Sequence, residues 1–338
     1  MLVLLLFLSI TLVSFPQIEM VKAEGTIYIR SDGSVEGTDK IQQDGNVYTF
    51  TDDIFDPIVV QRDDIVVDGA GYLLQGIGGG MGIHGITGVS IDDRSNVTVK
   101  NIQMKNFFYS IRLRNSSNNT IYGNKIIENS FGIDVSDSSF NIISDNTLTS
   151  NNDSINIYNS ARNFVSGNFI TNNNYYTIAV SGSSFNIISG NILTNNNNYC
   201  IFLSGASNNT IFANNITNNE IGITIYNSIG NMISHNNIIN NQHQIYLWDA
   251  NATWDDGYPS GGNYWSDYKG TDSNGDGIGD TPYTIDENNQ DNYPLVNVIP
   301  EFPSWTPTLL VLIVLAVAVA IYKRKLPKTA NSTNILGA

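Results

Sequence analysis

The chain has 338 residues, of which 41% are hydrophobic, enough apolar surface for a folded core. Only 14% are charged, and 31 acidic against 16 basic residues give a formal net charge of −15. Phosphate binding depends on clustered Lys and Arg, so this composition excludes nucleic acid as a default partner. The single cysteine, Cys200, excludes an intrachain disulfide.

The chain opens with an apolar run over residues 2–13, and Val21 and Ala23 supply small residues at positions −3 and −1 of a cleavage point. This pattern predicts a signal peptide over residues 1–23 and hence export. Residues 24–88 are predicted to form an N-terminal cap and the first coils of the domain that follows.

A repeat of 22 to 23 residues occupies residues 89–250 and predicts a solenoid. Two apolar positions per unit alternate with an outward one, as in a β-strand. The leading column is Val89, Ile111, Ile133, Ile155, Ile178, Ile201, Ile223 and Ile245. Further apolar columns start at Ile121 and Ile126, so each unit has three strand-like stretches. Leucine-rich repeats of similar length need a helical return, which is absent here. The pattern therefore predicts an all-β, single-stranded parallel β-helix.

Two asparagine columns follow the same spacing. They begin at Asn119 and Asn124 and recur in every later unit as far as Asn231 and Asn236. Stacked coils lie about 4.8 Å apart, so aligned carboxamides can hydrogen-bond from coil to coil as a ladder. We interpret these asparagines as scaffold and not as ligand-binding groups.

The outward positions of the leading strand form rows that could carry chemistry. Asp92, Asp134, Arg112 and Arg114 fall on adjacent coils and are the weak catalytic candidates, because carbohydrate-active β-helix enzymes need paired carboxylates or a base with a cation. We expect Arg112 to join the two aspartates in a salt-bridge ladder, which favours a binding surface over an enzyme.

Aromatic residues on the same outward rows are the candidate ligand-binding residues. Exposed rings on a flat polar face can stack on sugars or peptide partners. The alternative is that the aromatic-rich segment 254–268 folds over them. The candidates are Tyr158, Phe202, Tyr226, Tyr246 and Trp248.

Residues 251–297 are predicted to form a C-terminal cap with a calcium-like loop. Asp272, Asn274, Asp276 and Asp280 place oxygens at loop positions 1, 3, 5 and 9, and Ile278 supplies a carbonyl. Position 12 lacks the usual bidentate glutamate. The loop therefore predicts Ca²⁺ as a cofactor, and a polar capping loop is the alternative.

The remaining segments predict a membrane anchor. A linker over residues 298–305 leads into an apolar run over 306–322, long enough to cross a bilayer, and a basic cluster opens the tail 323–338. We predict a single transmembrane helix with a cytoplasmic tail and an extracellular ectodomain.

Several motifs carry a family resemblance. The segment 65–71, the repeated Asn-Asn-Thr-Ile and Gly-Asn units, and the segments 262–268 and 291–295 make the chain resemble NosD-type right-handed parallel β-helix proteins, many of them archaeal cell-surface proteins. Pro300-Glu301-Phe302 followed by the apolar run resembles PEF-type sorting signals. The resemblance implies copper delivery to a reductase. Copper sites need clusters of Cys, Met or His, whereas the chain has one Cys, five Met and His84, His235 and His243, so copper is not expected as a cofactor.

These observations predict a membrane-anchored cell-surface β-helix that binds glycans or envelope components. One alternative is a polysaccharide lyase or hydrolase that uses the same face. The other is a NosD-like accessory protein in the maturation of a copper centre.

Overall fold

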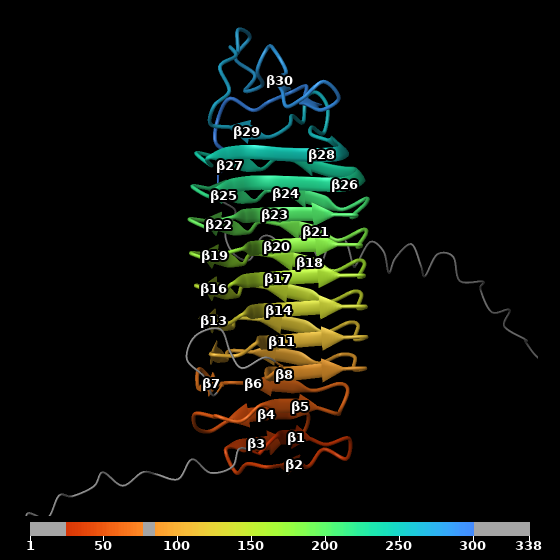
Figure 1. Ribbon diagram of the computed structural model, residues 1–338, viewed down its shortest axis with the longest axis vertical. Helices are drawn as coiled ribbons and strands as arrows, with labels where there is room; N and C mark the ends of the chain where they lie inside the picture. Colours follow the sequence, from red (N-terminus) through yellow and green to blue (C-terminus); the bar gives the residue numbers. More distant parts are fainter. Residues whose placement is uncertain (1–24, 77–84, 301–338) are drawn as a thin grey trace, which may run out of the picture.

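The structure is a computed structural model that describes residues 25–76 and 85–300. The predicted signal peptide, the transmembrane helix over 306–322, the tail and His84 lie outside the described residues. Within them, no helix is long and apolar enough to cross a membrane. The described chain is all β and forms a right-handed parallel β-helix (Figure 1).

Three parallel sheets run along the stack of coils. The first sheet carries the leading apolar column, and each of its strands pairs with the equivalent strand of the next coil. Its strands, in stacking order, are β1 (Ile27–Ile29), β5 (Ile58–Val60), β8 (Thr87–Asp92), β11 (Tyr109–Arg114), β14 (Phe131–Ser136), β17 (Asp153–Tyr158), β20 (Tyr176–Ser181), β23 (Tyr199–Ser204), β26 (Ile221–Ser234) and β28 (His243–Thr253).

The second sheet continues from the first around a corner, and the long strand β26 spans both. Its other strands are β4 (Val47–Phe50), β6 (Val66–Asp68), β9 (Thr98–Lys100), β12 (Thr120–Tyr122), β15 (Ile142–Ser144), β18 (Phe164–Ser166), β21 (Ile187–Ser189) and β24 (Thr210–Phe212). The third sheet closes the coil with β7 (Leu73–Gln75), β10 (Gln103–Lys105), β13 (Lys125–Ile127), β16 (Thr147–Thr149), β19 (Phe169–Thr171), β22 (Ile192–Thr194), β25 (Asn215–Thr217), β27 (Asn237–Ile239) and β29 (Tyr264–Trp265).

The apolar columns fill the interior as the spacing predicts. Ile133, Ile143 and Leu148, one from each sheet of a single coil, are all fully buried. Because every coil repeats this arrangement, the core is a continuous column of aliphatic side chains, and each coil is stabilised mainly by its two neighbours.

Asparagine ladders hold the corners, and this part of the prediction is confirmed. The side-chain oxygen of Asn141 accepts hydrogen bonds from both the backbone N–H and the side-chain amide of Asn119, at 2.9 and 3.1 Å. The structure adds a third ladder that the sequence analysis missed. Its members are Asn129, Asn151, Asn173, Asn196, Asn219 and Asn241.

Both ends of the stack are closed by non-repetitive chain. At the N-terminal end, β2 (Val35–Glu36) pairs with β1 and β3 (Ile41–Asp44) pairs with β4, both antiparallel. At the other end, β30 (Tyr283–Thr284) and β31 (Gln290–Asp291) form a small hairpin in the loops drawn in blue (Figure 1). Trp265 is buried there, stacks on Tyr283 at 4.2 Å and donates a hydrogen bond to Asp291.

Candidate functional site

The outward rows of the first sheet lie where the repeat places them. Arg112 is paired in register with Ser90 on one side and with Asp134 on the other, and Asp134 is paired with Asn156. The second row runs from Asp92 through Arg114 to Tyr158 and beyond. The weak catalytic candidates therefore share one face, as predicted.

A further outward row at the start of these strands was missed. It consists of Tyr109, Phe131, Asp153, Tyr176 and Tyr199 on successive coils. Two consecutive buried residues, such as Gly132 and Ile133, separate this row from the next, so it breaks the two-residue alternation by which the other rows were found. The signal was nevertheless present as an aromatic column at the same spacing.

The rings of this row form two clusters with Asp153 between them. Tyr109 stacks on Phe131 with centroids 4.9 Å apart, and Phe108 packs edge-on against both. On the other side, Tyr176 stacks on Tyr199 at 5.5 Å, and Tyr175 and Phe202 contact this pair. The backbone N–H of Tyr176 donates to the Asp153 carboxylate at 3.3 Å.

The predicted salt-bridge ladder forms only in part. Arg112 and Arg114 both approach the same carboxylate oxygen of Asp92, at 3.4 and 3.5 Å. The guanidinium of Arg112 also lies 5.5 Å from the centre of the Tyr109 ring. Within the described chain Asp134 has neither an ion pair within 4 Å nor a hydrogen bond, so Arg112 does not bridge the two aspartates as expected.

The two carboxyl groups on this face have raised pKa values. Burial raises the pKa of Asp134 to about 6; the Arg112 charge works against the rise, and the Asp153 charge adds to it. Burial also raises the pKa of Asp153, although hydrogen bonds from Tyr176 and Asn156 oppose the change. The Asp153 charge acts on Asp134 because the two residues lie on neighbouring coils of the same face.

Unpaired polar atoms lie on the same sheet as the two carboxyl groups. In the described part of the chain, Asp92 Oδ1, Arg112 Nε and Asn156 Oδ1 are buried and lack a hydrogen-bond partner. Each such atom costs the fold about 1–3 kcal/mol. Departures of this kind from a well-satisfied fold concentrate at functional sites, so this part of the face is the candidate active site.

The C-terminal half of the face is open. Tyr158, Tyr246 and Trp248 are 54%, 52% and 66% exposed, Tyr226 is also exposed, and Phe202 is partly buried among the rings described above. Residues 254–268 do not fold over these rings, because Trp254 and Trp265 are instead buried at the end of the stack.

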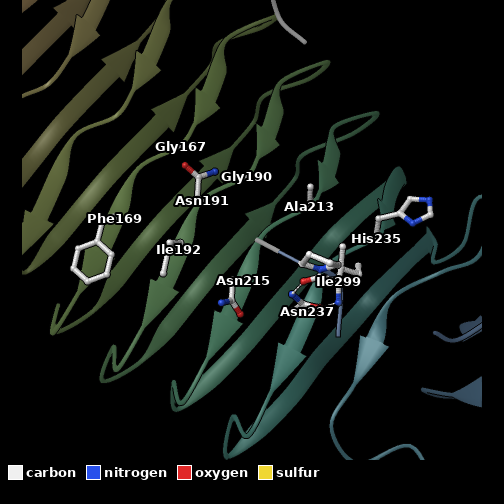
Figure 2. Close-up of a pocket in the computed structure, with 11 residues that line it drawn as sticks. Gly167, Phe169, Gly190, Asn191, Ile192, Ala213, Asn215, His235, Asn237 and Ile299 are labelled. Carbon is white, nitrogen blue, oxygen red and sulfur yellow. Dashed lines mark hydrogen bonds between the residues drawn. The ribbon is translucent and has the colours of Figure 1, made fainter. Parts of the chain in front are cut away.

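A separate hollow of about 240 Å³ lies along the third sheet (Figure 2). Phe169, Ile192 and Asn215 line it on successive coils. At its edge, the Asn237 amide exchanges two hydrogen bonds of 2.8 Å with the backbone of Ile299, which fastens the end of the described chain to this sheet.

The predicted calcium loop closes on itself through hydrogen bonds. Asp272 accepts backbone N–H groups of Gly275, Asp276 and Gly277, and the Asn274 side chain donates to Asp276. Asp280 accepts from Ser273 and Thr271, and these bonds hold the pKa of its carboxyl below the ordinary value. The carbonyl of Ile278 belongs to the same loop, and calcium binding stays a prediction.

Comparison with known families shows to which family the chain belongs. A family model described as periplasmic copper-binding protein (NosD) matches residues 60–270, which is more than half of the chain. The chain belongs to the NosD family. No curated protein sequence matches this NosD-family chain.

Solved structures resemble the NosD-family chain in fold. The periplasmic alginate epimerase AlgG matches with a TM-score of 0.50 and 17% identity over 63% of this chain and 69% of AlgG. The A-module of the mannuronan C-5 epimerase AlgE6 of Azotobacter vinelandii matches with a TM-score of 0.41 and 13% identity over 61% and 69% of the two chains. At these identities the likeness concerns the fold alone.

The described residues do not fit the copper implied by the family description. Cys200 is fully buried, and burial raises the pKa of its thiol well above the ordinary value, which disfavours the thiolate that binds copper. His235 contacts Ser260, and in residues 25–76 and 85–300 no three or more His, Cys, Asp or Glu side chains converge as metal ligands, those of the hydrogen-bonded calcium-like loop included.

Proposed function

We propose that this NosD-family protein binds glycans along the outer face of its first sheet, as an adhesion or recognition protein at the cell surface. The observation that carries the proposal is the long row of aromatic side chains on one open face. Rings stacked at coil spacing present flat apolar surfaces, and the asparagines, serines and threonines between them supply hydrogen bonds. Such a face matches the alternation of apolar and hydroxylated surfaces on a sugar chain.

The net charge of the protein favours one class of glycan. A chain with a net charge of −15 repels polyanions at long range, and Arg112 and Arg114 already approach Asp92. We therefore infer that the preferred ligand is a neutral glycan. We further propose that the apolar run 306–322 anchors the protein, with the β-helix outside the membrane.

A glycan array tests the proposal. The ectodomain is expected to bind neutral oligosaccharides, and the double variant Tyr246→Ala with Trp248→Ala is expected to lose at least about tenfold in affinity, equal to about 1.4 kcal/mol. Phe185→Ala is a matched control, because Phe185 is equally exposed but lies beyond the end of the first-sheet strand, where it contacts Arg162. Unchanged binding in the double variant, or no binding by the unmodified ectodomain, would contradict the proposal.

A further inference from the structure

We propose that Asp134 and Asp153 form a catalytic pair that hydrolyses a glycosidic bond of the glycan bound on the first sheet. This inference rests on the proposed function and adds an activity to it. The two residues lie on β14 and β17, adjacent coils of one face; the Asp134 side chain is partly exposed, and Asp153 is 6% exposed.

The spacing of the two carboxyl groups suits hydrolysis with inversion. Asp134 lies directly opposite Asn156 in the ladder, and the Asn156 amide donates to the Asp153 carboxylate at 3.3 Å. With a strand spacing of about 4.8 Å, this path puts the two carboxyl groups roughly 6 to 9 Å apart. Inverting glycosidases keep their acid and base about 6.5 to 9.5 Å apart to leave room for a water molecule.

The surroundings give the two groups different roles. Asp134 has no hydrogen-bond donor within the described chain, and a carboxyl in that position favours its protonated form. Asp153 accepts hydrogen bonds from the Tyr176 N–H and from the side chains of Asn152 and Asn156, which favour its carboxylate. Asp134 is therefore the general acid and Asp153 the general base.

The step balances with water as the only co-reactant. Asp134 gives its proton to the glycosidic oxygen as the bond between that oxygen and the anomeric carbon breaks. A water molecule attacks the anomeric carbon from the opposite side and loses its proton to Asp153. The products are an alcohol and a reducing sugar of inverted configuration, and solvent returns the proton from Asp153 to Asp134.

The rings around the pair provide the subsites. Tyr109 and Phe131 lie on the N-terminal side of Asp153, and Tyr176 and Tyr199 on the C-terminal side. A glycan that follows this row therefore crosses the carboxylate with sugars held on both sides. The glycosidic bond next to Asp153 would then be an internal bond of the glycan, which predicts cleavage within the glycan and not at its ends.

The test uses the ectodomain and soluble neutral glucan, mannan, galactan and arabinan, with release of reducing ends as the readout. Asp134→Asn and Asp153→Asn are each expected to lower the rate by about 100-fold to 10,000-fold while binding is kept. Asp137→Asn is the matched control, because Asp137 occupies a corner where the neighbouring coils carry Asn115 and Asn159. The anomeric configuration of the first product, read by NMR, is expected to be inverted.

The outcomes separate this inference from the proposed function. Binding of a polysaccharide without release of reducing ends by the unmodified protein would overturn catalysis and leave glycan binding in place. Equal rates for Asp134→Asn, Asp153→Asn and Asp137→Asn would also overturn it. Failure to bind any of the four polysaccharides would contradict both.

Discussion

Asp134 shows how burial of a single carboxyl group can weaken the fold. Its pKa in the folded chain is about 6, above the ordinary value of 3.8, mainly because of burial. The ionised form is thus less favoured in the folded than in the unfolded state. The stabilising effect of the protonated form is complete below about pH 4 and is lost as the pH rises through about 6.

We predict that Asp134→Asn stabilises the protein at pH 8 but not at pH 4. A shift of about two pKa units corresponds to roughly 3 kcal/mol, and residual exposure lowers the expected gain to about 1–2 kcal/mol. Chemical denaturation at both pH values, with Asp137→Asn as control, measures the difference. A variant that is less stable than the unmodified protein at pH 8 would show that Asp134 supports the fold.

The sequence predicts the residues of the candidate site only where buried and outward residues alternate strictly along a strand. Asp92, Arg112 and Asp134 were found because they follow the buried columns at a fixed offset. Asp153 was missed because two buried residues stand between it and its outward neighbour, Asn156. The exposure of Trp248 was also beyond sequence reasoning, since it depends on where the cap folds.

At the scale of elements, the asparagine ladders are as important for the stability of the stack as the strands. Asn163 donates its side-chain amide to Ser138 O and Asn186 Oδ1, and its oxygen accepts two hydrogen bonds from Asn141. All of these groups are buried, so water cannot replace a missing partner. The repeat allowed two of the three ladders to be predicted, and the third, from Asn129 to Asn241, is an equally regular column that the sequence reasoning overlooked.

We predict that Asn163→Ala lowers the free energy of unfolding by about 2–4 kcal/mol, because two or more buried groups lose their partner. Asn174→Ala is the matched control, since Asn174 is exposed on a neighbouring turn. Urea denaturation followed by circular dichroism measures both. Equal stabilities of the two variants would mean that the ladder adds little to the fold.

The cap loop is the element whose role is least determined by the repeat. If Asp272, Asn274, Asp276, Asp280 and the Ile278 carbonyl take up a cation, the internal hydrogen bonds to Asp272 must give way to metal ligation. We predict that Ca²⁺ binds to this loop with a measurable heat in titration calorimetry and that Asp276→Ala abolishes it. Titration without heat would leave the loop as a polar cap.

For the whole molecule, the fold is a stack in which the site extends over several coils. The aromatic row spans β11 to β23, so no single coil contains it. Folding and the proposed binding therefore depend on different features of a coil. A coil contributes to stability through its neighbours, whereas its contribution to the proposed binding depends on its place in the row.

We predict that removal of residues 187–209 leaves a folded β-helix. The deleted 23 residues correspond to one coil, so Asn186 takes the position of Asn209 and every buried column and ladder stays in register. Tyr199 and Phe202 are lost with that coil, while Asp134, Asp153 and Tyr176 remain. Glycan affinity is expected to fall by about tenfold, equal to about 1.4 kcal/mol, with cooperative unfolding retained.

Circular dichroism, urea denaturation and the glycan array measure these effects. The control is a deletion of residues 190–209, which is three residues shorter and moves polar residues into the core columns. That variant is expected to aggregate or remain unfolded. If the deletion of a complete coil also fails to fold, nearest-neighbour stacking does not account for the stability of the molecule, and if it binds glycan with unchanged affinity, Tyr199 and Phe202 do not belong to the binding face.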